Sequence, residues 1–336
     1  MAEQPAHDAF WSWWLDEGAA ACEAGIADGT LSDLVDEITA RVHAVSPELV
    51  WALGPGTTAE HVLVVSPEGN PDVRAAAHRW LLAAPAPTAT WQYADARPPA
   101  TDPASGGMRV GETDVDFAAI RVAATRVGNH VDVAVHHPAL RTLPEQARGA
   151  IAFLSLDHAL GETGCETWVG NVEVALDPPA DALTLEGVRD LVEQVARDAA
   201  GDDGEPVWVL LQGEQDGSPL MAAAQVPLAS SWAPHLDTHV EVDVPYADAT
   251  PDGLPALEVL DALRGLEDHL AERLGATARL VAHETGRRHR LLHFYADSAT
   301  PAAAVVEAAV TGWEQGGVEV RATADPSWHG VRHLRT

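Results

Sequence analysis

The chain has 336 residues, of which 46% are hydrophobic, and this length and composition are sufficient for two globular domains. Its 51 acidic residues outnumber its 20 basic residues, which gives a formal net charge of -31, and every basic residue is Arg. The absence of Lys excludes Schiff-base and pyridoxal enzymes, P-loop nucleotide hydrolases and protein kinases, because all of them use a Lys amine. The negative charge argues against direct nucleic-acid binding and favours a basic partner.

The cysteines and the N-terminal sequence indicate the cellular compartment of the protein. Cys22 and Cys165 are the two cysteines, and neither belongs to a C-x-x-C pair, so a disulfide framework and a cysteine zinc site are not expected. The N-terminal sequence lacks the basic start and the apolar run of a signal peptide, and no apolar segment reaches the length of a membrane span. We therefore expect a cytoplasmic protein that has no membrane contact and no cofactor.

An aromatic helix is expected near the N-terminus. Within residues 8–22, Phe10, Trp13 and Trp14 recur at i, i+3 and i+4, which predicts a helix with one aromatic face. Trp11 falls to the side of that face. Such a stripe is typical of a core helix, and an exposed protein-binding patch is the alternative.

The chain then repeats a module of two strands, one helix and a further strand, and each closing strand runs into an Asp and Pro stop. A helix over residues 32–43 precedes the modules. We expect the first module to contain strands 49–53 and 61–65, a helix over 71–82 and strand 89–94, and the second to contain strands 117–126 and 130–136, helix 143–160 and strand 166–174. The Pro- and Gly-rich segment 98–107 is expected to be a loop.

The C-terminal half has a different order of elements. An amphipathic helix over residues 183–199 precedes the segment AGDDGEP, which we interpret as a domain linker, and Asp216-Gly217 between two apolar runs predicts a β-hairpin. The remaining pattern predicts strand 239–244, helix 255–273, strands 277–283 and 289–295, helix 301–314 and strand 317–323. This β-α-β-β-α-β order is that of the split βαβ, or ferredoxin-like, sandwich.

The predicted fold class is therefore α+β, with tandem ferredoxin-like sandwiches and mainly antiparallel sheets. We expect an N-terminal α+β domain with two ββαβ units over residues 1–180, a helix and linker over 181–203, and a C-terminal ferredoxin-like domain with an N-terminal hairpin over 204–336. The alternation in VEVDV and VEVRA predicts sheets with one face packed on helices and the other face left free.

Segments in both halves resemble uncharacterised families. The segments DGLPALEVLDALRGLEDHL, HRLLHFYA and VEVRATADPSW resemble a bacterial family of domains of unknown function (family 695), which is similar in turn to the RraB family that regulates ribonuclease E. The segments FWSWWLDE, VSPEGNP, LDHALGE and WVGNVEV resemble the domain that commonly accompanies it. The resemblance implies a regulatory role and carries no catalytic residues to this chain.

A histidine cluster provides the candidate site residues. His289 and His293 share one face of a predicted strand, about 7 Å apart, and together with His283 on the preceding strand they offer a metal site on the free sheet face. Asp325 and His329 after the last strand offer an acid/base pair. Histidines outside a known ligand motif are more often surface residues, and the neighbouring Arg residues repel a cation, so we predict no metal site and no catalytic centre.

We therefore expect a non-enzymatic regulatory or protein-binding protein whose acidic surface engages a basic or nucleic-acid-binding protein. A metal- or water-dependent hydrolase that uses the histidine cluster is one alternative. A small-ligand sensor with its site between the two lobes is another.

Overall fold

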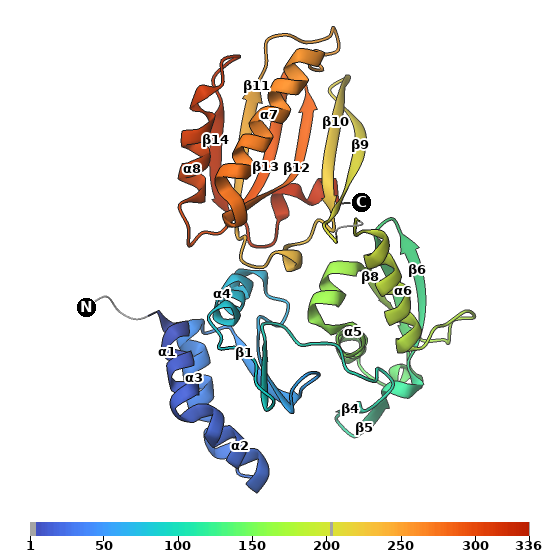
Figure 1. Ribbon diagram of the computed structural model, residues 1–336. Helices are drawn as coiled ribbons and strands as arrows, with labels where there is room; N and C mark the ends of the chain where they lie inside the picture. The colour runs from blue at the N-terminus through green and yellow to red at the C-terminus, as the bar shows by residue number, and fades with distance from the viewer. Residues whose placement is uncertain (1–4, 202–203, 336) are drawn as a thin grey trace. The chain divides into compact units, whose positions relative to one another are not determined.

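The computed structural model describes residues 5–201 and 204–335. The chain divides into an N-terminal unit, Met1–Thr125 with Val131–Val192, and a C-terminal unit, Arg126–His130 with Glu193–Thr336. Both units combine helices with sheets in which most strand pairs are antiparallel, so the predicted α+β class is confirmed (Figure 1). Among the described residues, none of the helices combines the length and the apolar character required to cross a membrane.

Aromatic side chains build the core of the first module in the N-terminal unit. Helix α1 (Ala6–Trp13) runs through a π-helical turn into α2 (Ala19–Asp28), and α3 (Val35–Val45) packs beside α1. Phe10, Trp13 and Trp14 are buried, as the helical spacing predicts. Trp11 is buried as well, because its ring packs on Trp80 and Tyr93, and its Nε1–H donates a 2.7 Å hydrogen bond to the carbonyl oxygen of Trp80. The aromatic group is therefore a core and not an exposed patch.

The first module has the predicted order of elements. Strands β1 (Val50–Pro55), β2 (His61–Ser66) and β3 (Trp91–Ala94) form a sheet in that order, and α4 (Pro71–Leu82) connects β2 to β3. The β2 and β3 strands are parallel, which requires a crossover of this kind. Helix α4 begins with Pro71 at N1 and with Asn70, whose side-chain oxygen accepts the N–H of Asp72, as its cap.

The second module follows the same order. Strands β6 (Arg121–Val127), β7 (His130–His136) and β8 (Val169–Val174) form a sheet with β7 and β8 parallel, and α5 (Glu145–Trp168) connects them. Helix α6 (Leu185–Asp198) follows the module. The segment predicted to be a loop is followed by a short hairpin, β4 (Gly107–Val110) and β5 (Thr113–Asp116), which sequence reasoning missed.

The C-terminal unit has one six-stranded sheet with the order β14-β11-β13-β12-β10-β9. The strands are β9 (Val207–Gln215), β10 (Ser218–Val226), β11 (Thr238–Pro245), β12 (Ala278–Gly286), β13 (His289–Ala296) and β14 (Glu319–Ala324). Helices α7 (Leu257–Leu274) and α8 (Ala302–Ala309) lie on one face. From β11 to β14 the predicted β-α-β-β-α-β order is present, with antiparallel neighbours throughout. The three-stranded sheets of the N-terminal unit do not repeat this six-element pattern, so the tandem detail is not confirmed.

The second face of this sheet is partly covered, in contrast to the free face that the strand alternation predicts. Trp328, Val331 and Leu334, at the end of the chain, pack with Leu236 and Tyr295 in a second core cluster. Trp328 stacks on Tyr295 with ring centroids 4.4 Å apart, and its Nε1–H donates to the carbonyl oxygen of Leu236 at 2.8 Å. The segment around Trp328 therefore covers part of the face that was predicted to be free. The periodicity of a strand indicates which residues share a face, but it does not indicate which other segment packs on that face.

Candidate functional site

Helix α5 is broken at Gly161, within the segment LDHALGE. Gly161 has φ 72° and ψ 160°, a backbone conformation that is essentially restricted to glycine. A Cβ atom at this position would lie 2.8 Å from both Cδ and N of Pro99, so the close approach of that loop also requires glycine. The predicted helix 143–160 thus ends where the break occurs, and a second short helical stretch continues to Trp168.

The loop that contains Pro99 bonds to both halves of the broken helix. The N–H of Ala100 donates to the carbonyl oxygen of His158 at 2.9 Å, and the N–H of Glu162 donates to the carbonyl oxygen of Arg97 at 3.0 Å. A helix break leaves backbone N–H and C=O groups without their usual partners inside the helix, and the hydrogen bonds to the loop take the place of the missing ones.

Arg189 of α6 fastens the same loop to the helix. Its Nε–H donates to the carbonyl oxygen of Ala159 at 2.8 Å, and its Nη2 donates to the carbonyl oxygen of Ala100 at 2.5 Å. The position of the break is therefore fixed from both the loop side and the α6 side.

Glu162, directly after the break, joins three segments of the chain. Its Oε2 accepts hydrogen bonds from the hydroxyl of Ser66 at 2.6 Å and from the N–H of Arg97 at 3.2 Å, and its Oε1 accepts the N–H of Gly69 at 2.9 Å. The side chain is buried, and a buried carboxylate is tolerated when donors surround it in this way. Ser66 and Gly69 lie in the segment VSPEGNP and Glu162 in the segment LDHALGE, so two segments that are distant in the sequence meet here.

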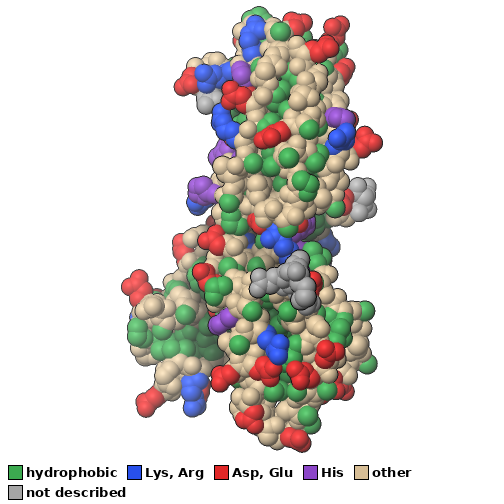
Figure 2. Space-filling view, turned by 90° about the vertical axis from the view of Figure 1, so that its left-hand side faces the viewer, with side chains coloured by type: hydrophobic (Ala, Val, Ile, Leu, Met, Phe, Trp, Pro, Cys, Tyr) green, Lys and Arg blue, Asp and Glu red, His purple; other side chains and the backbone are tan. Residues whose placement is uncertain are grey.

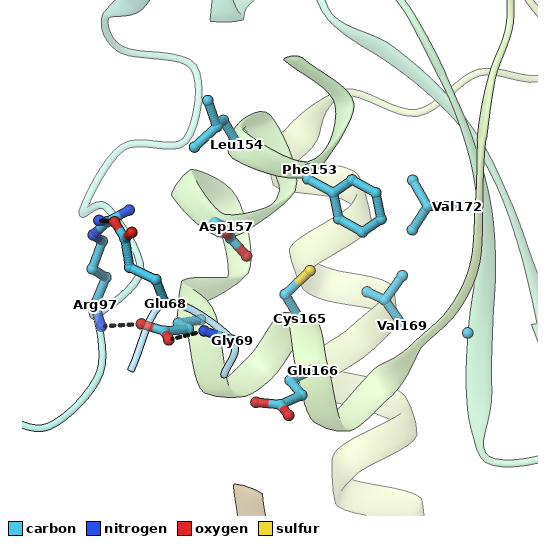
Figure 3. A pocket seen from close by; sticks show the side chains of 12 residues that line it. Glu68, Gly69, Arg97, Phe153, Leu154, Asp157, Cys165, Glu166, Val169 and Val172 are labelled. Atoms are coloured by element: carbon cyan, nitrogen blue, oxygen red, sulfur yellow. Dashed lines mark hydrogen bonds and ion pairs between the residues drawn. The ribbon is translucent and has the colours of Figure 1, made fainter. Parts of the chain in front are cut away.

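A pocket of about 480 Å³ lies beside the break (Figure 3). The residues that line it are Glu68, Gly69, Arg97, Phe153, Leu154, Asp157, Glu162, Cys165, Glu166, Val169, Gly170 and Val172. Figure 3 shows the side chains of Asp157 and Cys165 between an apolar side, formed by Phe153, Val169 and Val172, and the side that carries Glu68 and Arg97. The pocket therefore combines an apolar wall with several carboxylates.

Asp157 and Cys165 face each other from the two halves of α5. Burial raises the pKa of Asp157, and the charge of Glu162 adds to this, while the hydrogen bond from the thiol of Cys165 and the charge of Arg97 act in the opposite direction. Burial, followed by the charge of Asp157, raises the pKa of the Cys165 thiol far above its ordinary value. The thiol is therefore protonated at neutral pH, and Cys165 donates a hydrogen bond and is not an activated nucleophile.

Three of the four acidic side chains in the pocket have partners that account for their charge. Glu68 forms an ion pair with Arg97, Glu166 forms one with Arg74 of α4, and Glu162 accepts the three hydrogen bonds described above. Asp157 has no ion-pair partner among the residues that the structure describes. The arrangement is suited to holding a cation beside Asp157, with an apolar body against Phe153, which is 53% exposed.

The histidines selected from the sequence lie in the C-terminal unit, and the structure separates them. His283 lies on the helix-covered face, where its Nδ1 is 3.4 Å from Oε1 of Glu267 on α7. His293 lies on the opposite face, 3.0 Å from His239 between Nδ1 and Nε2. His289 is exposed and pairs with Asp243 at 2.7 Å. These three histidines therefore do not surround a common metal position.

The register of the β12–β13 hairpin explains the separation. Gly286 lies opposite His289, and the pairing continues without a shift, so that His283 lies opposite Leu292 and Ala282 lies opposite His293. Residues directly opposite in an antiparallel pair share a face, and the next residue along a strand points to the other face. The structure therefore places His283 and His293 on opposite faces of the sheet.

A hydrogen-bonded chain of four side chains lies on the second face, and sequence reasoning missed three of its members. Glu284 lies 3.1 Å from Nε2 of His293 and 2.9 Å from Nε2 of His333, and His293 continues the chain to His239. Burial, assisted by the charge of His293, lowers the pKa of His239 to about 4 against a partial opposing effect of Asp325. His239 is therefore neutral at pH 7.

Asp325 and His329 are close in the structure but do not form an acid/base pair between side chains. Asp325 accepts the hydroxyl of Tyr295 at 2.6 Å and the backbone N–H groups of His329 and Gly330 at 2.8 Å. Asp325 thereby caps the turn that leads to the C-terminal segment. In the described part of the chain, no group of three or more His, Cys, Asp and Glu side chains is arranged to hold a metal ion.

The C-terminal unit thus defines an α+β domain built on one sheet with two helices on one face. Residues 208–333, which span most of it, match the model of DUF695, a family of unknown function. The match confirms the sequence resemblance of this half to an uncharacterised family. No curated protein and no solved structure matches the chain.

Proposed function

We propose that the protein is a non-enzymatic binding protein, and that the pocket at the break in α5 holds a cationic side chain of a basic partner protein. The observation that carries this proposal is Asp157, a half-buried carboxylate with no ion-pair partner among the described residues, in a pocket with three further carboxylates and one Arg. A partner Lys or Arg supplies the missing counter-charge and lowers the free energy of the buried carboxylate.

The shape of the pocket agrees with a Lys or Arg side chain. Such side chains carry an apolar stem below a charged head. The stem contacts Phe153 and Val172, and the head reaches Asp157, which Figure 3 shows between the two sides of the pocket. The excess of acidic residues over the whole chain, 51 against 20, attracts such a partner over a longer range.

The resemblance of the C-terminal half to RraB-type regulators supports a further element of this proposal. Binding of the partner changes the activity of that partner, which is a regulatory function in the cytoplasm. A basic protein that itself binds nucleic acid is the expected target, because its binding surface is complementary to a strongly acidic one.

The pocket is tested with tryptamine, which carries an ammonium group on an apolar ring, and with tryptophol, its uncharged analogue. Ligand-observed NMR on the full chain is expected to show binding of tryptamine that weakens with added salt, and about tenfold weaker binding of tryptophol. The Asp157→Asn variant keeps the acceptor for Cys165 and is expected to lose this preference. Glu145→Gln, at the exposed start of the same helix, is the matched control and leaves it unchanged.

The partner is tested by pull-down from a lysate with the same variants. A basic protein that is retained by the wild-type chain and by Glu145→Gln, but released by Asp157→Asn and by added salt, is the expected result. Equal retention by all three chains contradicts the assignment of the pocket, and a complex that is insensitive to salt contradicts the electrostatic basis of the proposal.

A further inference from the structure

The sheet of the C-terminal unit extends beyond the helices that cover it. Helices α7 and α8 pack on the strands from β14 to β12, and the β9–β10 hairpin continues the sheet past β12 (Figure 1). A cavity of about 650 Å³ lies on the helix side, between α7 and this hairpin. It is within the size range of small-molecule sites.

The walls and floor of this cavity are apolar. Trp208 and Leu210 form one wall of the cavity. They lie on β9, the edge strand of the sheet, and are 43% and 79% exposed. The floor is Ala223, which lies opposite Leu210 on one side and opposite His283 on the other. A small residue at the centre of this row creates the depth of the cavity, and the exposed apolar wall indicates a surface that a ligand covers.

Buried polar side chains close the inner end. The Nε–H of Arg290 donates to Oγ1 of Thr285 at 2.9 Å, and its Nη1 donates to Oε1 of Glu267 at 2.7 Å. The side chain of Arg290 is 6% exposed and that of Glu267 is 13% exposed. The Nδ1 atom of His283 lies 3.4 Å from the same Oε1 of Glu267, so Glu267 holds both basic side chains at the inner end of the cavity.

The charge of the lining is opposite to that of the chain. Arg264 and Arg290 carry two positive charges against the single carboxylate of Glu267, whereas the chain as a whole has 51 acidic and 20 basic residues. Because Arg290 and Glu267 neutralise each other, the net positive charge of the lining is that of Arg264 on α7, whose Nη1 is 3.5 Å from Oδ1 of Asp261 on the exposed surface of the same helix. An exposed pair of this kind is weak, and the guanidinium has further N–H groups for an anionic ligand. An anionic group is therefore favoured at the α7 side of the cavity.

We propose that this cavity binds a small amphipathic carboxylate. Its aromatic or acyl body lies over Ala223 against Trp208 and Leu210, and its carboxylate accepts hydrogen bonds from Arg264. This inference concerns a different unit and a ligand of opposite charge, so it does not depend on the proposed function of the pocket at α5.

The probes are indole-3-acetate and octanoate, each with its uncharged analogue, tryptophol and 1-octanol. Ligand-observed NMR on the full chain is expected to show at least one carboxylate binding about tenfold more tightly than its analogue. Ala223→Leu fills the floor and Leu210→Gln makes the exposed wall polar, and each is expected to reduce binding at least fivefold. Arg264→Gln is expected to remove the preference for the carboxylate, and Arg273→Gln, on the same helix but outside the cavity, leaves it unchanged.

The outcomes separate the two sites. Loss of carboxylate binding in Ala223→Leu and Leu210→Gln, with binding retained in Asp157→Asn, supports the cavity, and the melting temperature of each variant shows that it is folded. Absence of binding by both carboxylates up to about 10 mM overturns the proposal, since fragments of this size in a formed site bind more tightly than that. Equal binding of the uncharged analogues, or an unchanged preference in Arg264→Gln, overturns it as well.

Discussion

Asp157 is a carboxylate whose environment makes its charged form unfavourable. Burial and the neighbouring charge of Glu162 raise its pKa above the ordinary value of 3.8. The folded state therefore holds the proton of Asp157 more tightly than the unfolded state, and the resulting stability is present at low pH and lost as pH rises through the raised pKa. Above the raised pKa, the ionised side chain is expected to lower the stability of the N-terminal unit.

The first prediction concerns the stability of the chain when the charge of Asp157 is removed. Asp157→Asn removes the buried charge and keeps an oxygen that accepts the thiol of Cys165, so the melting temperature at pH 7 is expected to rise while binding of tryptamine is lost. Calorimetry of both chains between pH 7 and pH 4 checks the effect, and the gain is expected to shrink as pH falls. A lower melting temperature of the variant at pH 7 would show that the ionised carboxylate is stabilising.

His239 gives the second prediction. Its folded-state pKa of about 4 lies below the ordinary value of 6.5, so between these pH values the unfolded chain binds a proton that the folded chain excludes. The wild-type C-terminal unit is therefore expected to lose stability as pH falls from 6.5 to 4. His239→Gln should show a shallower loss in chemical denaturation over that range, and parallel curves for the two chains would contradict the assignment.

At the scale of single elements, the break in α5 is the feature that forms the first pocket. Two glycines in this helix differ in their surroundings. Gly161 has a positive φ and lies against Pro99, whereas a Cβ atom at Gly149 would meet no heavy atom within 4 Å. A helix that was continuous through Gly161 would place Asp157 and Cys165 on a regular surface and would close the gap that receives the loop.

The third prediction uses this pair of glycines. Gly161→Ala is expected to destabilise the N-terminal unit by about 1–3 kcal/mol, because alanine is strained at this φ and ψ and contacts Pro99. Gly149→Ala, in the regular part of the same helix, is expected to stabilise it by about 0.5–1 kcal/mol. Urea denaturation measures both changes, and similar effects of the two substitutions would mean that the break is not a requirement of the fold.

At the scale of the whole molecule, the dominant feature is repulsion between acidic groups. Surface pairs such as Arg109 with Asp114 and Arg141 with Asp177 involve a minority of the carboxylates, since the chain has 51 acidic residues and 20 Arg. Exposed pairs of this kind contribute little to stability. The long-range repulsion therefore determines the sign of the response to salt.

The fourth prediction is that salt stabilises the folded chain. Raising NaCl from about 0.02 M to about 0.5 M shortens the Debye length from roughly 20 Å to roughly 4 Å and weakens the repulsion among the carboxylates. The melting temperature is expected to rise by several degrees at pH 7, and KCl at the same ionic strength is expected to give the same rise, which shows that the effect is one of screening and not of a particular salt. A fall in melting temperature would mean that the ion pairs outweigh the repulsion.

The sequence by itself determined the properties that depend on local pattern and on composition. Apolar periodicity gave the order of strands and helices in both units, because burial of one face imposes a spacing of two or 3.6 residues. Strand alternation correctly placed His293 and Tyr295 on the face opposite Leu292 and Phe294. The absence of Lys excludes the enzyme classes that use a Lys amine, and the net charge predicts the sign of the response to salt.

The tertiary structure decided what depends on a single irregular residue or on segments distant in the chain. The register of the β12–β13 hairpin, in which His283 lies opposite Leu292, places His283 and His293 on opposite faces, and the periodicity of each single strand does not fix how the two strands are paired. Gly161 breaks α5 because the loop at Pro99 approaches it from outside the helix. Ser66 and Glu162 meet across 96 positions, a contact that is set by the packing of two modules and not by the residues beside either one.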